Sequence, residues 1–564
     1  MRTIHGKIRK ATSTPVGKII FFTIVFLIIA GIAGGLIYWR YYRKQIIRNS
    51  LENTISSKTK GLYALKYDEL KLDEMGGFLS VTNLRLTYDS ARYAALAGQD
   101  LAPSTLLRIY IPQLTVTGVK TPRALIDKEI VGQALTLTKP EIEIIYTNAG
   151  KDSARNVPTR EIYRQILGDL NLIRIDTVTI AGGTISTRNI RNKTKNIELN
   201  NTGVVLIGVA IDSAANEDTT RILFAKNVYL AAESVKWGTA DGRYNFKVDS
   251  ITMQSTSRDL FVKRFRMIPR SGEDAFVKSL PTQDDRFDFR FSKIRIRNID
   301  LGQLFDENLV ADTVQISAAN MLIYRDLNIP RDKKNRVGTY PHQAIARIPL
   351  PIRIQTLQLF NTYVEYKEKS AITKQAGRVQ FYKATATFTN LTNRKQDIEE
   401  NNIMTVDINT SFMNRTPLRA RWTFFLFNPQ GRFNIEGSLG KINAADLNVL
   451  TEPMGPARIE EGTINGMNFN LAGNDNHLAG TVKLLYDDLK ITVLGKDGDT
   501  KKIEKKTLAT IAANFIVKNS NPSRRNAEPR VIQVDEPRDK NRSIFNLTWK
   551  TLFKGIRETV GIKK

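Results

Sequence analysis

The sequence predicts a mainly β protein with an N-terminal transmembrane helix. We expect an elongated, twisted β-sheet groove to follow, with a few short helices and a C-terminal amphipathic helix. Three observations support this prediction: one uncharged apolar segment could cross a bilayer, alternating apolar and polar residues dominate beyond Gly61, and the last residues are apolar at helical spacing. A chain of 564 residues is also long for one core, which favours several domains or one elongated structure.

The apolar segment is Ile19–Trp39, which contains no charged residue. At about 1.5 Å per residue, it matches the hydrocarbon thickness of about 30 Å. A cleaved signal peptide would have a shorter apolar run and a small-residue cleavage site, whereas this run ends in Tyr-Trp-Arg-Tyr-Tyr. We therefore expect an uncleaved single-pass anchor. The flanking Lys and Arg residues are balanced and do not set its orientation, so we place residues 1–18 in the cytoplasm because that arrangement is common.

The rest of the chain divides by its periodicity. Residues 40–60 have Ile and Leu at helical spacing, which predicts a juxtamembrane helix, and residues 61–542 form the β-rich body. Within that body we expect one helix at Pro158–Leu170. Charge and polarity predict irregular loops at Arg331–His342 and Thr392–Asn402.

An eight-residue pattern recurs in the body: apolar, polar, apolar, two polar, apolar, polar, apolar. Its copies are Leu79–Leu86, Ile173–Ile180, Phe246–Met253, Ile294–Leu301 and Ile352–Leu359. Because side chains alternate faces along a strand, the polar pair would move later apolar residues to the wrong face unless a β-bulge restores the phase. The pattern predicts bulged strands in a curled sheet with one apolar face. Ordinary strands of a β-sandwich are the alternative.

The apolar positions of this pattern are the candidate groove residues. They would equally fit a packed core, and core packing is the default at any single position. The candidates are Ile173, Ile175, Val178, Ile180, Ile294, Ile296, Ile352, Ile354, Leu357 and Leu359.

Residues 543–564 predict an amphipathic helix with basic residues opposite an apolar stripe. A basic helix with Trp and Phe can lie in a membrane interface. The alternative is a helix that caps the end of the sheet, whose edge needs covering. The stripe consists of Phe545, Trp549, Leu552, Phe553, Ile556 and Val560.

Charge and chemistry restrict the function. The net charge is +28 and both ends are basic, which favours anionic lipid as a partner, and no nucleic-acid motif accompanies the charge. The chain has no cysteine, and its three histidines lack metal-ligand spacing. Phosphate-loop, dinucleotide and nucleophile-elbow motifs are missing. We therefore expect no catalytic residues, no metal, no cofactor and no enzymatic activity. A hydrolase acting on envelope polymers remains a third reading, because glycosidase carboxylates leave no motif.

Several phrases resemble the AsmA-like family of bacterial envelope proteins, in particular a Bacteroidetes-type member. Thr54–Leu86 looks like the start of that family, with a short helix and then strands ending in Leu-Ser-Val-Thr-Asn-Leu. Other segments resemble its internal strand pairs, its C-terminal module and its tail: Ile173–Ile185, Ile352–Tyr366, Ala445–Leu471, Gly480–Leu494 and Phe545–Gly561.

This resemblance implies an inner-membrane anchor, a periplasmic body and a long β-sheet groove. It also implies a role in outer-membrane homeostasis, with lipids carried between membranes. The expected partners are membrane lipids, the inner membrane itself, and a protein of the outer membrane or envelope. The alternative is a scaffolding envelope protein with a packed β-sandwich body that binds protein partners.

Overall fold

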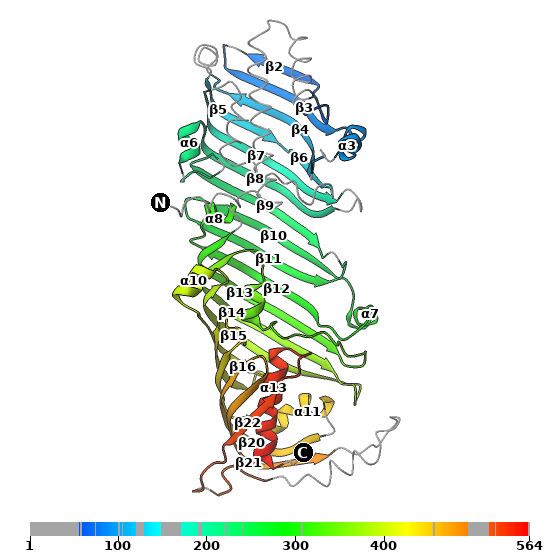
Figure 1. The fold of residues 1–564 in the computed structure, drawn as a ribbon, viewed down its shortest axis with the longest axis vertical. Helices are drawn as coiled ribbons and strands as arrows, with labels where there is room; N and C mark the ends of the chain where they lie inside the picture. Colours follow the sequence, from blue (N-terminus) through cyan, green and yellow to red (C-terminus); the bar gives the residue numbers. More distant parts are fainter. Residues whose placement is uncertain are drawn as a thin grey trace. The chain divides into compact units, whose positions relative to one another are not determined.

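The computed structural model describes residues 56, 59–73, 75–99, 102–103, 105–119, 129–147, 171–189, 195–218, 220–222, 224–239, 241–305, 308–454, 457–493, 518–524 and 526–561. These residues are mainly β, with a large, twisted, mixed sheet and short helices (Figure 1). They divide into two compact units. Unit 1 comprises the described residues within Met1–Ala240, Asn245–Phe265 and Arg295–Val310, and unit 2 comprises Asp241–Tyr244, Arg266–Ile294 and the described residues from Ala311 onward.

Several predicted segments fall outside the described residues. They are the N-terminus 1–18, the transmembrane helix Ile19–Trp39, nearly all of the juxtamembrane helix 40–60, and the helix Pro158–Leu170. Within the described part of the chain, no helix combines the length and the apolar character needed to cross a membrane.

Unit 1 is built on a run of strands that pair mostly with their neighbours in sequence. Strands β5 and β6 pair in parallel with β7. The other strand pairs among the described residues of β1–β10 are antiparallel: β1–β3, β2–β3, β3–β4, β4–β5, β4–β6, β7–β8, β8–β9 and β9–β10. The strands are β1 (Tyr63–Lys66), β2 (Glu69–Asp73), β3 (Phe78–Tyr88), β4 (Thr105–Thr117), β5 (Glu129–Thr138), β6 (Glu141–Tyr146), β7 (Leu172–Asn189), β8 (Lys195–Ile211), β9 (Asn227–Gly238) and β10 (Tyr244–Gln254). Helix α3 (Ser90–Ala97) lies between β3 and β4, and helix α6 (Ser213–Glu217) lies between β8 and β9. Unit 1 also contains the short helix α8 (Leu301–Phe305).

The boundary between the units passes through the central strands β10, β11 (Asp259–Pro269), β12 (Arg286–Arg297) and β13 (Leu309–Asp326). Unit 2 then continues as an antiparallel run in the order β14, β15, β16, β17, β18, β20, β21, β22. These strands are β14 (Ile352–Lys369), β15 (Ala376–Thr392), β16 (Ile403–Phe412), β17 (Thr416–Phe425), β18 (Phe433–Leu439), β19 (Ile442–Asn443), β20 (Ala457–Gly473), β21 (His477–Val493) and β22 (Ile532–Pro537). Its helices are α7 (Glu273–Lys278), α9 (Pro341–Ala346), α10 (Lys395–Glu400), η1 (Ala444–Leu447), α11 (Asn448–Met454) and α13 (Ile544–Val560).

The predicted loop at Thr392–Asn402 is wrong for most of its length, because Lys395–Glu400 forms helix α10. The Thr392 hydroxyl donates to Asp397 over 2.8 Å, and the Arg394 backbone N–H donates to that hydroxyl over 3.1 Å. These bonds hold the first turn, and Ile398 is buried. The predicted loop at Arg331–His342 is irregular up to Tyr340, and helix α9 begins at Pro341.

The recurring eight-residue pattern marks left-handed backbone instead of the register shifts that we expected. In the first copy, Leu79 and Val81 before the polar pair and Leu84 and Leu86 after it are all buried. Asn83, the second residue of the pair, has φ of 52°. The register between β3 and β4 is unchanged across it. The buried apolar side chains therefore change from odd-numbered to even-numbered positions at Asn83, whose backbone is left-handed. No extra residue is inserted into the pairing of β3 with β4.

In three further copies, the left-handed residue lies on the neighbouring strand. Gly208 stands opposite Asp176, Ser234 opposite Asp249 and Asn390 opposite Gln355, and the φ angles are 67°, 59° and 58° respectively. The register in each of these ladders is again constant at the polar pair. The shifts in the β7–β8 and β14–β15 ladders occur after Ile180 and Leu359 instead.

The copy at Ile294–Leu301 departs from the prediction in another way. Strand β12 ends at Arg297, Asn298 has φ of 50°, and Leu301 begins helix α8. The left-handed Asn298 ends the strand here instead of continuing it, so this copy is half strand and half turn.

Candidate functional site

Two rows of apolar side chains cross the sheet of unit 2. Each residue in a row is the direct cross-strand partner of the next, so each row is a continuous ladder. The first ladder is Leu357, Phe388, Val406, Trp422, Ile435 and Leu471. The second ladder is Leu359, Ala386, Ile408, Ala420, Gly437, Phe469, Val482 and Ile532. We call them the apolar ladders of unit 2.

A polar row lies between them in register. Its members alternate with the apolar ladders along every strand, so their side chains project from the opposite face. This polar ladder is Gln358, Thr387, Asp407, Arg421, Glu436, Asn470, Thr481 and Gln533. The sheet of unit 2 therefore has one apolar face and one polar face.

Helix α13 packs on part of the apolar face. Ser543 caps its N-terminus by accepting from the Asn546 N–H, and Gly561 ends it with φ of 93°. Ile544, Leu547 and Val560 are buried in the same cluster as Val482 and Val534 of β21 and β22. The helix comes close to β21 because residue 555 is glycine: a Cβ there would lie 2.6 Å from the Cβ of Val482.

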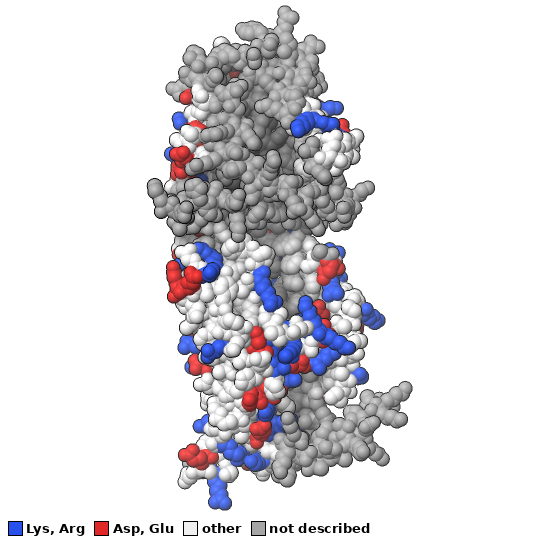
Figure 2. Space-filling view, in the orientation of Figure 1, with Lys and Arg blue, Asp and Glu red and all other residues white. Residues whose placement is uncertain are grey.

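The coverage of the apolar ladders is uneven. Under α13 and its neighbours, Ile435 and Leu471 are buried. At the β14–β17 end, Leu357, Phe388 and Trp422 are only partly buried. Val406, which lies between Phe388 and Trp422 in the first ladder, is buried. Figure 2 shows a largely uncharged area at the level of β12–β15, bordered by Lys, Arg, Asp and Glu side chains. This half-exposed end of the apolar ladders is the candidate site.

Unit 1 carries apolar ladders of the same kind. One consists of Leu79, Val116, Leu135, Val178, Leu206 and Val228, and the other of Val81, Leu114, Leu137, Ile180, Val204, Leu230 and Met253. Nearly all of these side chains are buried. Thus two of the predicted groove residues, Val178 and Ile180, stand in continuous apolar rows.

The other predicted groove residues have different surroundings. Ile173 and Ile175 are buried on β7, where Ile130 and Ile211 are the cross-strand partners of Ile173. On β12, Ile294 and Ile296 are half-buried, and on β14, Ile352 and Ile354 are buried. Leu357 and Leu359 begin the two apolar ladders of unit 2 and are half-buried.

Sequence reasoning missed the other side chains of the candidate site: Phe388 on β15, Val406 and Ile408 on β16, and Trp422 on β17. The signal was present in Met404-Thr-Val406-Asp-Ile408, a plain period-two alternation without the polar pair.

The predicted apolar stripe of the C-terminal helix divides between two faces. Phe545, Trp549 and Phe553 are 65%, 45% and 49% exposed. Leu552 and Ile556 are half-buried against the sheet cluster, and Val560 is buried in it. One face therefore caps the sheet and a second face presents an aromatic row to solvent.

A polar cluster ties the segment before α13 to the rest of unit 2. The Arg538 guanidinium forms a buried ion pair with Asp475 and lies 4.0 Å from the centre of the Tyr340 ring. Asp475 also accepts from the Gln343 amide over 2.8 Å, and Tyr340 donates to the Asn474 carbonyl over 3.0 Å. We call this cluster the clasp, because it joins α9, the β20–β21 turn and the residues that lead into α13.

His342 is packed beside the clasp. Its ring centre lies 4.9 Å from that of Phe424 and 6.3 Å from that of Tyr340. The side chain is buried, and neither ring nitrogen has a hydrogen-bond partner among the described residues. Burial lowers the pKa of His342 from 6.5 to about 4, against a smaller opposing effect of the Asp475 charge. The ring is therefore neutral at pH 7.

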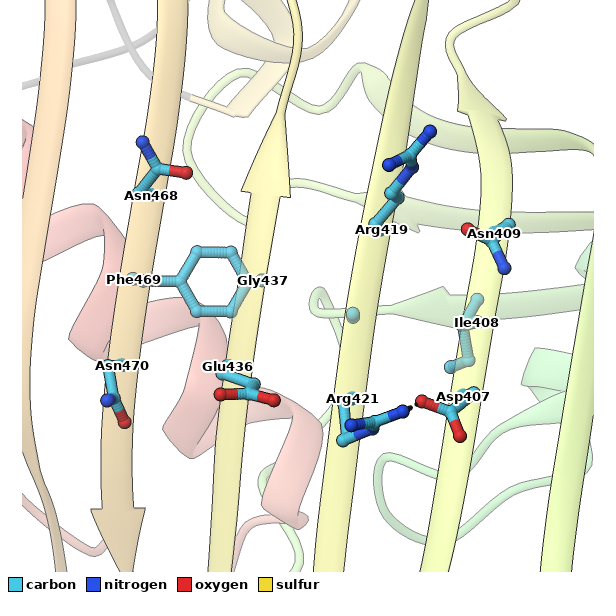
Figure 3. Close-up of a pocket in the computed structure, with 11 residues that line it drawn as sticks. Asp407, Ile408, Asn409, Arg419, Arg421, Glu436, Gly437, Asn468, Phe469 and Asn470 are labelled. Carbon is cyan, nitrogen blue, oxygen red and sulfur yellow. Dashed lines mark hydrogen bonds and ion pairs between the residues drawn. The ribbon is translucent and has the colours of Figure 1, made fainter.

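A concave surface of about 600 Å³ lies on the polar face across β16, β17, β18 and β20. Figure 3 shows Asp407, Arg421 and Glu436 projecting toward the viewer, with α13 behind the strands. The Arg421 Nε donates to Asp407 over 2.5 Å, and this hydrogen bond raises the pKa of Arg421 above its usual value. Because Arg421 is the cross-strand partner of both carboxylates, their charge is partly compensated within the surface itself.

Within the described residues, no group of three or more His, Asp or Glu side chains is placed to hold a metal ion. A scan against protein-family models found no match, and a search of curated proteins found none either. The resemblance to AsmA-like proteins therefore remains a prediction from the sequence.

Proposed function

We propose that this chain is an AsmA-like protein anchored in the inner membrane of a bacterium, with its bulk in the periplasm. In this proposal it serves outer-membrane homeostasis by binding lipids on its apolar sheet face and conducting them between membranes. The anchor is Ile19–Trp39, and the orientation follows the family resemblance.

One observation carries the proposal: the apolar ladders of unit 2 continue past the helices that cover them. Leu357, Phe388 and Ile408 belong to the same ladders as the buried core, yet they are partly exposed. A packed sandwich would place a second sheet there, whereas the described elements that pack on this face are helices such as α13. An apolar ligand is the natural occupant of such a surface.

The physical gain suits an acyl chain. Each methylene removed from water contributes about 0.8 kcal/mol. A segment of ten methylenes would therefore gain about 8 kcal/mol before the costs of ordering the chain and of losing its translational freedom. The continuity of the ladders means that a chain displaced along them meets equivalent apolar side chains, which allows movement without a large barrier.

A site-specific photocrosslinker tests this proposal in the full chain within the envelope. We place a benzophenone amino acid at Phe388 or Ile408 of the apolar ladders, and separately at Thr387 or Asp407 of the polar ladder. Thr387 and Asp407 are chain neighbours of Phe388 and Ile408 and face the opposite side, so they are matched controls.

The expected result is covalent lipid, identified by mass spectrometry, at Phe388 and Ile408 but not at Thr387 and Asp407. Crosslinks to protein alone at the apolar positions would support the scaffolding alternative. Equal lipid labelling of both faces would show non-specific contact and would refute the proposal.

A further inference from the structure

Three aromatic side chains form a row along the solvent side of α13. Phe545, Trp549 and Phe553 are spaced by four residues, so they share one face of the helix. The rings of Trp549 and Phe553 are stacked with their centres 6.2 Å apart. The ring centre of Phe545 lies 6.1 Å from that of Trp422 on β17. We call these three residues the aromatic row.

The sheet fixes the direction in which the aromatic row points. Ile544, Leu547 and Thr551 are buried on the other side of the same helix. Rotation of the helix to bury the rings would expose that buried side to water. The free-energy cost would be about 25 cal/mol for each Å² of apolar surface exposed. The exposed rings are therefore a stable property of the packed helix, and three adjacent exposed aromatic side chains typically mark an interaction surface.

Basic side chains lie near the aromatic row, together with Asp539, on which the charge of Lys550 acts. Lys550 is exposed on the helix, next to Trp549 in sequence. Arg542 precedes the helix, and burial together with the positive charges of Arg331 and Arg325 lowers its pKa from the usual value. Among the described residues, neither Lys550 nor Arg542 forms an ion pair, and Lys554 donates to the neutral Asp535 carbonyl over 2.6 Å. The surface thus has positive charge available for an anionic partner.

We propose that the aromatic row and Lys550 dock unit 2 onto the surface of an anionic lipid bilayer. Phe and Trp rings enter the boundary between headgroups and acyl chains, while basic side chains remain with the phosphates. This inference rests on the proposed function, because it supplies a membrane contact far along the chain from Ile19–Trp39. A protein partner is the competing occupant, and the combination of exposed aromatic rings with the exposed Lys550 favours lipid.

The lack of cysteine in the chain allows a clean test. The full chain, held in phosphatidylcholine nanodiscs, carries the fluorophore NBD on Asn546→Cys, beside the aromatic row. Vesicles of pure phosphatidylcholine, or of phosphatidylglycerol mixed with phosphatidylcholine, are then added. We expect a blue shift of NBD emission and co-flotation only with the phosphatidylglycerol vesicles.

The variant F545S/W549S/F553S removes the aromatic row and keeps Ile544, Leu547 and Thr551 on the buried side of α13. Because it also removes the contact of Phe545 with Trp422, the variant W549S/F553S, which keeps that contact, is measured beside it. It should weaken vesicle binding by about tenfold or more. The matched control replaces three exposed apolar residues elsewhere in unit 2 (I372S/F427S/V449S), with exposed fractions of 57%, 47% and 43%, and should bind as the unchanged chain does. Protection of α13 from protease verifies that the helix stays docked in both variants.

Lys550→Glu should weaken vesicle binding more at low salt than at high salt, because the contribution of Lys550 is electrostatic and salt screens it. Binding that survives loss of the aromatic row, or that is equal for neutral and anionic vesicles, would overturn the inference. Binding only to envelope membranes and never to protein-free vesicles would overturn it in favour of a protein partner. Photocrosslinking at Phe388, measured in parallel, separates the two proposals: lipid at Phe388 with no docking refutes this inference alone, whereas docking without lipid at Phe388 refutes the proposed function.

Discussion

Replacing His342 with phenylalanine should remove a large acid sensitivity from the clasp region of unit 2. The imidazole is 2% exposed and lies between the rings of Tyr340 and Phe424. Phenylalanine keeps the ring shape and removes two nitrogens that have no hydrogen-bond partner among the described residues. The charge that acts on the ring is that of Asp475, which forms an ion pair with Arg538.

The magnitude follows from the pKa of His342, which is about 4 in the folded chain and about 6.5 when unfolded. The unfolded chain binds the proton first as the pH falls, so the free energy of unfolding decreases between pH 6.5 and pH 4. At about 1.4 kcal/mol for each pH unit of difference, the loss between pH 7 and pH 4 is about 3 kcal/mol, of which about 2 kcal/mol is lost by pH 5.

Hydrogen exchange of the peptide that covers 339–348 measures the local opening free energy at pH 7 and pH 5 after correction for the intrinsic exchange rate. The unchanged chain should lose about 2 kcal/mol more between these conditions than His342→Phe does. His477, whose ring is exposed beside Asp535, provides the matched control, and His477→Phe should retain the acid sensitivity of the region around His342. Identical pH dependence in the unchanged chain and His342→Phe would refute the reasoning.

Two further predictions concern the packing of unit 2. Gly555→Ala would favour an isolated helix by about 1 kcal/mol. Its methyl group meets Val482, however, and should destabilise the docked α13 by about 1–3 kcal/mol. Protease should then cleave that helix faster, and slower cleavage would contradict the close approach. Arg538→Met leaves Asp475 buried without its partner and should lower the free energy of unfolding by about 3–5 kcal/mol in urea titrations followed by tryptophan fluorescence. Arg421→Met breaks an exposed ion pair and should lower the free energy of unfolding far less than Arg538→Met does, so equal losses would contradict the role of burial.

Much of the β architecture could be predicted from periodicity, because strand residues alternate between two environments. Ile175 and Val178 lie on either side of a polar pair and are both buried, as one apolar face requires. The position of the left-handed residue beside each polar pair could not be predicted. In one copy it is Asn83 within the pair, and in another it is Gly208 on the neighbouring strand. Cross-strand placement depends on the register, which local sequence does not contain.

The candidate site shows the same division. Leu357 and Leu359 were predicted from their strand. Phe388, Ile408 and Trp422 join them only through the successive pairing of β14 with β15, β15 with β16 and β16 with β17. Their partial exposure is a property of packing, because Val406 and Phe424 on the same strands are buried.

The sequence by itself determined the uncharged segment Ile19–Trp39, the alternating strands and the amphipathic C-terminal helix, because each depends on residues close together in the chain. Tertiary structure decided which side of that helix meets the sheet. The predicted stripe ran through Phe545 and Val560 together, yet Val560 is buried and Phe545 is exposed. The reason is steric: Gly555 is the position at which the helix can approach Val482 closely, and this contact turns the aromatic row outward.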